Sequence, residues 1–225
     1  MKLGILGTGH VATVLGGAWS TTHEVTLGSR DPAKDTGFTV RSLTDTVASA
    51  DVVVNAILGS AAVEVISGIN AGAFAGKTLV DVANATTPSF DLVYPESSLA
   101  EQLQDARPDA RVVKSMNTAA ITTIANPGVI GPSSVFLSGD DAGAKLEAAG
   151  LLKDLGWSDD DIVDLGGIET ARGPEHYIVL FAKLAGLLRT EAFSIRVARS
   201  PSRDLRRVRR ARPARPYCLA SALLL

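Results

Sequence analysis

The sequence contains few of the residues that build disulfide-stabilised folds or metal clusters. Among its 225 residues there is one cysteine, Cys218, and there are three histidines, while aromatic residues make up 5%. A single cysteine excludes an internal disulfide and a cysteine metal cluster. The acidic triplet at residues 159–161 lacks the glycine and the distal glutamate of a calcium-binding loop, so we expect no metal site.

Long apolar runs and an N-terminal signal pattern are also missing. Hydrophobic residues make up 46% of the chain, but no uninterrupted apolar segment approaches the roughly 20 residues that span a bilayer. No secretory signal pattern precedes the first apolar segment, at residues 2–6. We therefore expect a cytoplasmic protein without a membrane partner. The length suffices for one domain with a full core and a small appendage.

Charge is divided unevenly along the chain. The formal net charge is −2, yet residues 196–225 carry nine arginines against one acidic residue, so the rest of the chain is strongly acidic. An acidic body argues against general nucleic-acid binding. The arginine- and proline-rich end has three interpretations. The first, which its composition favours, is a disordered, solvated tail. The second is an arm that contacts nucleic acid or a membrane surface. The third is that the segment results from a shifted reading frame or another artefact.

Strand-like and helix-like segments alternate along most of the chain. Strands are predicted at residues 2–6, 23–27, 38–40, 52–58, 77–82 and 111–116, and helices at 11–19, 42–50, 61–69 and 99–106. The run 52–58 is almost continuously apolar, which is typical of a parallel strand buried on both faces. This alternation with short connections predicts an α/β fold with a doubly wound, mostly parallel Rossmann sheet.

A small C-terminal α/β extension is predicted after this sheet. Residues 134–137 and 161–165 are predicted as strands, 142–155 as an amphipathic helix, and 168–197 as helical with a break near Gly173-Pro174. Apolar residues recur at helical spacing between Tyr177 and Leu188, which indicates packed core or a dimer face. We expect a homodimer that forms through these last helices.

The first predicted strand ends in a glycine motif, Gly7-Thr8-Gly9-His10-Val11-Ala12, which also opens a helix. In a dinucleotide-binding fold, Gly7 permits the tight turn and Gly9 lets the backbone approach a pyrophosphate. The small Ala12 lets the helix pack closely on the strand. The free N–H groups and the dipole of a helix N-terminus favour an anion there. We therefore assign all six residues to cofactor binding.

The residues after the second strand indicate which dinucleotide binds. An NAD enzyme places Asp or Glu there to hold the ribose 2′-hydroxyl. This chain has Gly28-Ser29-Arg30, with Lys34 about one helical turn later. A hydroxyl and a guanidinium suit a 2′-phosphate, so we expect NADP(H). Asp31 either pairs with Arg30, which would weaken this preference, or begins a turn.

The other candidate site residues follow the later strands. Ligands of such a sheet bind beyond the carboxyl ends of the strands. Those ends lead into Ile57 and Leu58, Asn84, and Met116-Asn117-Thr118. This rim has no Ser-His-Asp set, no paired carboxylates and no histidine cluster. Hydride transfer fits such a rim because cofactors supply the chemistry and the protein supplies the geometry, so we assign no catalytic acid or base.

Three of these segments together resemble one known family. Residues 7–12, residues 28–30 with Lys34, and residues 113–118 (Val-Lys-Ser-Met-Asn-Thr) are similar to the NADPH:coenzyme F420 oxidoreductases. The resemblance covers residues 1 to about 199 and implies that the glycine motif and Ser29-Arg30 hold NADPH. It also implies that Ile57 and Leu58 lie beside the nicotinamide. The residues implied near the deazaflavin ring of coenzyme F420 are Asn84, Met116, Asn117 and Thr118.

Two positions depart from the pattern of that family. Gly59-Ser60-Ala61 stands in place of the more usual Pro-containing turn, and Met116 stands where Phe is common. The small-molecule redox acceptor therefore stays open between coenzyme F420 and other classes. FMN or FAD is one alternative, and an imine or ketone is another, which would need a proton from His176 or Lys114. A non-catalytic NADP-binding regulatory module is the alternative from a different class.

These interpretations divide the chain into three parts. Residues 1–130 are predicted to form the NADP-binding Rossmann domain. Residues 131–199 are predicted to form the extension, with the helices that contact the acceptor and a second subunit. Residues 200–225 form the basic tail.

Overall fold

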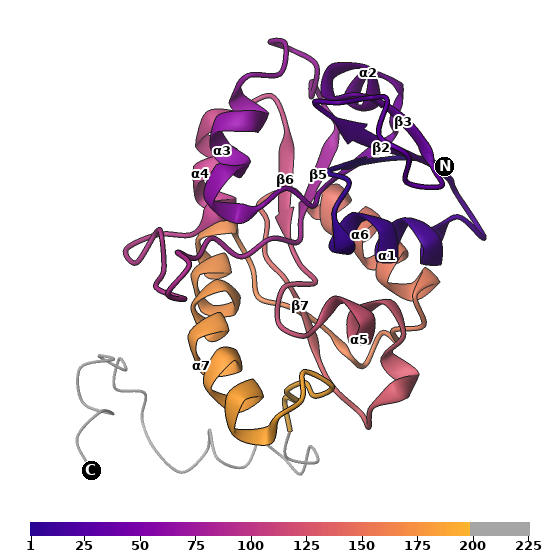
Figure 1. Ribbon diagram of the computed structural model, residues 1–225. Coiled ribbons are helices and arrows are strands. Elements are labelled where there is room, and N and C mark those ends of the chain that lie inside the picture. The colour runs from indigo at the N-terminus through magenta and orange to yellow at the C-terminus, as the bar shows by residue number, and fades with distance from the viewer. Residues whose placement is uncertain (199–225) are drawn as a thin grey trace, which may run out of the picture.

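The computed structural model describes residues 1–198 and has a six-stranded sheet between two layers of helices (Figure 1). The strands are β1 (Lys2–Leu6), β2 (Glu24–Ser29), β3 (Thr39–Ser42), β4 (Val52–Asn55), β5 (Thr78–Asp81) and β6 (Arg111–Lys114). Every pairing is parallel, and the order across the sheet is β3-β2-β1-β4-β5-β6. The order reverses between β1 and β4, which is the doubly wound Rossmann arrangement. The predicted fold class is confirmed.

Helices cover both faces of the sheet because each strand sends alternate side chains into two apolar layers. On β1, Leu3 and Ile5 belong to one core cluster and Leu6 belongs to the other. Three helices pack on the first cluster, α1 (His10–Trp19), α6 (Ala142–Asp154) and the short α5 (Ile121–Ala125). Three pack on the second, α2 (Leu43–Ser49), α3 (Gly59–Ser67) and α4 (Leu99–Ala106). Burial on both faces explains why these strands are so apolar.

The C-terminal extension shares the core of the sheet. Its two strands, β7 (Val135–Leu137) and β8 (Ile162–Asp164), form a separate parallel pair. An isolated bridge between Lys114 and Ser138 joins this pair to β6, the last strand of the large sheet. Side chains of β7 and α6 lie in the same cluster as those of β1. The domain boundary near residue 130 therefore stays a prediction, and the predicted basic tail lies outside the described residues.

The last helix differs from its prediction at both ends. A short 3-10 turn, η2 (Ile168–Ala171), leads directly into α7 (Arg172–Leu188). The predicted break near Gly173-Pro174 is wrong, because Pro174 lies in the first turn, where its missing N–H needs no partner. The predicted continuation to residue 197 is also wrong. Arg189 adopts a left-handed conformation with φ 54° and ends the helix.

After α7 the chain returns to the extension. The Ser134 N–H donates to the Ile195 carbonyl (2.8 Å), and the Val197 N–H donates to Ser134 Oγ (3.1 Å). Figure 1 shows α7 leaving the body beside α4 and running along the outside of the molecule before this return. The short helix α5 and the 3-10 turn η1 (Pro127–Val129) lie between β6 and β7.

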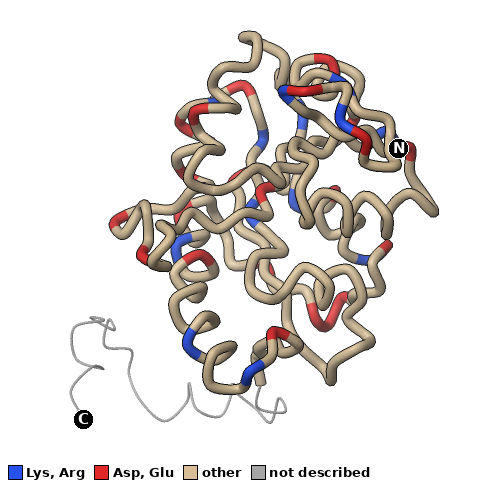
Figure 2. Tube along the Cα trace, viewed as in Figure 1, with Lys and Arg blue, Asp and Glu red and all other residues tan. Residues whose placement is uncertain are grey.

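The described surface carries charges of both signs. Figure 2 shows basic and acidic residues interspersed along the trace, with no continuous basic stripe over residues 1–198. Among the helices of this part of the chain, none has both the length and the apolar character that crossing a membrane requires.

We expect Trp19 to be one of the largest single contributors to stability. Its side chain is fully buried between α1 and α6, and its indole Nε1–H donates to the Leu151 carbonyl (3.1 Å). Trp19→Ala should lower the free energy of unfolding by about 3–5 kcal/mol, because it leaves a large cavity. Urea denaturation followed by circular dichroism measures this loss. Leu146→Ala, at an exposed position of α6, is the control and should stay within about 0.5 kcal/mol of the wild type. Equal losses in the two variants would contradict the packing described.

Candidate active site

The glycine motif forms a tight turn between β1 and α1. Gly7 has φ 123°, and a Cβ on it would lie 2.7 Å from the Ala56 carbonyl oxygen at the end of β4. The Gly7 N–H donates to the Gly28 carbonyl at the end of β2 (2.9 Å). Gly7 therefore holds the ends of three neighbouring strands together in a space that no side chain could enter.

The N-terminus of α1 fits an anionic group. A Cβ on Gly9 would meet nothing within 4 Å, so the backbone there faces open space. No side chain caps α1, and its first turn contains no acidic residue. Its first N–H groups are thus available to a pyrophosphate, with His10 exposed and Val11 partly buried beside them. Ala12 is buried in the core between helix and sheet.

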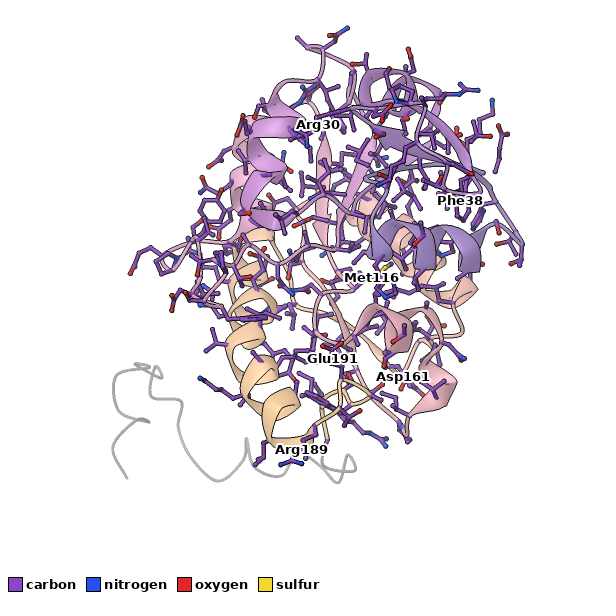
Figure 3. All side chains as sticks on the ribbon, viewed as in Figure 1. Arg30, Phe38, Met116, Asp161, Arg189 and Glu191 are labelled. Carbon is purple, nitrogen blue, oxygen red and sulfur yellow. The ribbon has the colours of Figure 1, made fainter. Side chains whose placement is uncertain are left out.

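The predicted 2′-phosphate residues lie next to the glycine motif. Lys34 Nζ donates to Thr8 Oγ1 (3.1 Å), so a cation that follows β2 already contacts the loop that follows β1. Ser29 and Arg30 line an open hollow of about 350 Å³, whose other walls are the start of α2, residues of α3 and the turn after α3. Figure 3 shows Arg30 beside α3. Asp31 caps its own turn through the Ala33 N–H (3.1 Å), so the turn interpretation of Asp31 is the one observed.

The two residues predicted to contact nicotinamide follow β4. Ile57 is partly buried against the second core cluster, whereas Leu58 is 72% exposed at the N-cap of α3. The next residue, Gly59, allows two loops to touch. A Cβ on Gly59 would lie 2.5 Å from the Asn84 carbonyl carbon and 2.7 Å from the Ala85 nitrogen. In this arrangement of the two loops, position 59 has no room for a side chain.

The two candidate amides of the acceptor side bond to each other. Asn84 Nδ2 donates to the Asn117 carbonyl (2.8 Å), and Asn117 Nδ2 donates to Asn84 Oδ1 (3.0 Å). Asn117 is 5% exposed, and its Oδ1 is buried without a hydrogen-bond partner among the described residues. Thr118 is buried beside it. An unpartnered buried carbonyl oxygen can accept a hydrogen bond from a ligand N–H group.

Met116 contributes backbone, not side chain, to this rim. Met116 is 2% exposed, and its side chain packs in the first core cluster. Figure 3 shows it in the interior of the molecule. Its φ of 61° is left-handed, a conformation that is strained for a residue with a Cβ. The strained turn aims the following Asn117 back toward Asn84. A Phe-to-Met difference at this position therefore changes the core beneath the rim.

A buried ionic cluster lies directly below the rim. Lys114, at the end of β6, is 2.8 Å from Asp81 Oδ2 and 3.1 Å from Glu175 Oε1 (Nζ to oxygen). Burial alone would lower the pKa of Lys114, but the two carboxylates outweigh it and raise the pKa. The prediction of Lys114 as a source of protons does not fit this arrangement. Asp81 and Glu175 were not among the predicted site residues. The only feature of the sequence that could have identified them is a charged residue inside an apolar segment.

The remaining titratable candidates lie at the start of α7. His176 Nε2 is 3.2 Å from the Ser97 carbonyl oxygen, so the ring is turned toward the loop before α4. The hydroxyl of Tyr177 is buried with no partner among residues 1–198, and burial raises the pKa of Tyr177. On the outer face of α7, Leu180 and Leu187 are exposed. The predicted homodimer through this helix stays a prediction.

The predicted site residues thus occupy one edge of the sheet. Contacts run from Lys34 to the glycine motif, from there to the end of β4, and through Gly59 to the Asn84–Asn117 pair. A doubly wound sheet with an uncapped helix after its first strand and an open edge at its switch point defines a dinucleotide-binding protein of the Rossmann class.

Comparisons with known proteins define the family. The family model for coenzyme F420-dependent NADP oxidoreductases matches residues 2–85. A proposed F420-dependent NADP reductase from Arthrobacter sp. FB24 has a similar structure. It has a TM-score of 0.83 and 38% identity, over 88% of this chain and 100% of the other. The chain therefore belongs to the F420-dependent NADP oxidoreductase family and is an NADP-dependent oxidoreductase.

Two further structures are more distant. The hypothetical protein SMa0349 from Sinorhizobium meliloti matches with a TM-score of 0.60 and 27% identity, over 77% of this chain and 88% of the other. A reductive aminase from Aspergillus terreus, in complex with NADPH4, cyclohexanone and allyl amine, matches with a TM-score of 0.61 and 21% identity. The match covers 84% of this chain but 62% of the aminase, and at this identity it shows the fold alone.

We expect Gly59→Ala to separate the two halves of the rim. The added methyl group would overlap the backbone of Asn84 and Ala85, which should cost about 1–3 kcal/mol in the free energy of unfolding. Gly17→Ala is the matched control, because Gly17 lies inside α1 where a Cβ meets nothing within 4 Å. That control should be stabilised by about 0.5–1 kcal/mol. Thermal unfolding of both variants tests the pair, and a stable Gly59→Ala protein would contradict the contact.

Proposed function

We propose that this protein transfers hydride between NADP(H) and the deazaflavin coenzyme F420. Family membership supports the reaction class, and the predicted site residues lie along one open edge of the sheet. When both are bound, the nicotinamide and deazaflavin rings supply the redox chemistry. The protein's part is to hold the two rings face to face and to exclude water.

The NADP(H) half of the proposal is supported by the loops after β1 and β2. The uncapped start of α1 would bind the pyrophosphate through residues 7–12. Ser29, Arg30 and Lys34 would bind the 2′-phosphate, because Ser29 and Arg30 line the hollow at the end of β2 and Lys34 contacts Thr8 of the glycine motif. Ile57 and Leu58 would bound the nicotinamide.

The acceptor half is carried by one observation. The rim formed by Asn84 and Asn117 offers amide groups and an unpartnered carbonyl oxygen, and no ionisable side chain. Such a rim orients a planar heterocycle through its N–H and carbonyl edge and gives it no proton. A deazaflavin fits because hydride adds to a ring carbon and the accompanying proton exchanges with solvent. The Met116 backbone and Thr118 would complete this side.

An imine or ketone substrate is supported less well. Reduction of either requires a proton on nitrogen or oxygen as hydride arrives. Lys114 is fully buried between two carboxylates, and His176 is turned toward the Ser97 carbonyl. Two further alternatives are tested below. One is that the protein reduces FMN or FAD, and the other is that it is a regulatory module that binds NADP without turnover.

Arg30→Ala should weaken NADPH binding and leave NADH binding nearly unchanged, because only NADPH carries the 2′-phosphate. Loss of a charge-assisted contact of this kind costs on the order of 1.5–3 kcal/mol. Titration of nicotinamide fluorescence measures both dissociation constants. Lys2→Ala, an exposed cation at the opposite end of β1, is the control and should change neither. Equal weakening of NADPH and NADH by Arg30→Ala would refute the assignment.

The acceptor is tested by NADPH oxidation at 340 nm with coenzyme F420, FMN, a cyclic imine and no acceptor in parallel. We expect turnover with coenzyme F420 and not with the others. Turnover with the imine would reassign the acceptor and require a proton donor outside the rim described. NADPH binding without turnover on any acceptor would replace the proposal with the regulatory module.

A further inference from the structure

The carboxyl ends of three neighbouring strands carry a row of polar residues. Asn55 ends β4, Asp81 ends β5 and Lys114 ends β6. They are consecutive partners in the parallel register, Asn55 with Asp81 and Asp81 with Lys114. Partners in adjacent strands lie about 5 Å apart and point to the same face of the sheet. The row therefore forms a continuous polar layer where the rest of that face is apolar.

Each member of the row holds the backbone of a loop above it. Asn55 Oδ1 accepts from the Ile57 N–H (3.1 Å), and Asn55 Nδ2 donates to Asp81 Oδ1 (2.8 Å). Asp81 Oδ1 also accepts from the Ala83 N–H (3.2 Å). Lys114 Nζ donates to the Ala83 carbonyl. Ala83, which directly precedes Asn84, is thus held from both its N–H and its carbonyl.

The Lys114 ammonium is saturated within this cluster. It has three N–H groups, and they meet the Asp81 carboxylate, the Glu175 carboxylate and the Ala83 carbonyl. Glu175 is itself anchored, because its carboxylate accepts from the Leu99 N–H (2.7 Å) and the Ala100 N–H (3.1 Å) at the start of α4. The ammonium is therefore fixed in three directions by β5, α7 and the loop after β5.

We propose that Lys114 is a positioning residue, which sets the spacing between the loop of Ile57 and the Asn84–Asn117 pair. This inference rests on the proposed function, because those two loops are the ones assigned to the nicotinamide and to the acceptor. Within residues 1–198, the side-chain hydrogen bonds and ion pairs of Asp81, Lys114 and Glu175 do not reach the loops assigned to the pyrophosphate and the 2′-phosphate. Loss of Lys114 should therefore impair ring alignment and leave NADPH affinity intact.

The test uses a variant that removes the ammonium without leaving buried charges unpaired. Lys114→Met alone would strand two buried carboxylates and could prevent folding, so it is combined with Asp81→Asn and Glu175→Gln. Trp19→Phe is the matched control for stability, because it removes the indole N–H bond to the Leu151 carbonyl far from the rim. Both proteins are compared at temperatures equally far below their unfolding midpoints.

Two readouts separate positioning from stability. The triple variant should bind NADPH within about twofold of the wild type, while its kcat with coenzyme F420 falls by about 100-fold, as expected for an ångström-scale misplacement. Trp19→Phe should keep both values. An equal fall of kcat in the two variants, or an unchanged kcat in the triple variant, would overturn the proposal.

Hydrogen exchange of the ligand-free proteins gives a readout that does not depend on the acceptor. Backbone amides of residues 83–85 and 115–118 should exchange about tenfold faster in the triple variant, while those of residues 7–12 stay unchanged. Unchanged exchange at residues 83–85 would contradict the role of Lys114 even in an active enzyme. If residues 83–85 exchange faster in the triple variant but the wild-type protein reduces no acceptor, the proposed function is wrong. Lys114 is then still the residue that fixes this loop.

Discussion

The parallel register of the central strands is the constraint on which the site depends. Leu6, Asn55, Asp81 and Lys114 are consecutive partners at the ends of β1, β4, β5 and β6, so these strands stop at one level. All the loops that follow therefore open on the same edge. Gly7 and Gly59 then let adjacent loops approach to distances that a Cβ would forbid. If one of these strands shifted its register by one residue, its side chains would point to the opposite face of the sheet and the loops would separate.

The two halves of this edge present different chemical groups, backbone N–H groups and cations in one and a side-chain network in the other. The half proposed to bind the nucleotide consists of backbone N–H groups at the start of α1 and cations that follow β2, which are groups that suit phosphate. The half proposed to bind the acceptor rests on side chains that bond to one another, the Asn84–Asn117 pair above and the Lys114 cluster below. Backbone recognition tolerates sequence change, whereas a side-chain network alters when one member changes. The departure at Met116 falls in this second half.

Most of the elements and the tight turn at the glycine motif were predictable from the sequence because their signals are local. The glycine motif, the apolar run of β4 and the helix at Leu99–Ala106 each depend on neighbouring residues; Ser98 caps that helix through the Glu101 N–H. The Lys114 cluster was not predicted, because Lys114 and Asp81 are 33 residues apart and meet only through the strand register. The end of α7 was misplaced because apolar residues continue past Leu188, and a left-handed Arg189 leaves no periodic signal. The five-residue α5 was too short to show a period.

The central claim is that the edge holds a nicotinamide and a deazaflavin ring close enough for direct hydride transfer. The most direct measurement uses NADPH that carries deuterium on one or the other face of the nicotinamide C4 carbon, with coenzyme F420 as acceptor. We expect the reduced deazaflavin to contain deuterium from one face only, as measured by mass spectrometry. Reduced deazaflavin that contains solvent hydrogen in place of deuterium from either face would contradict it.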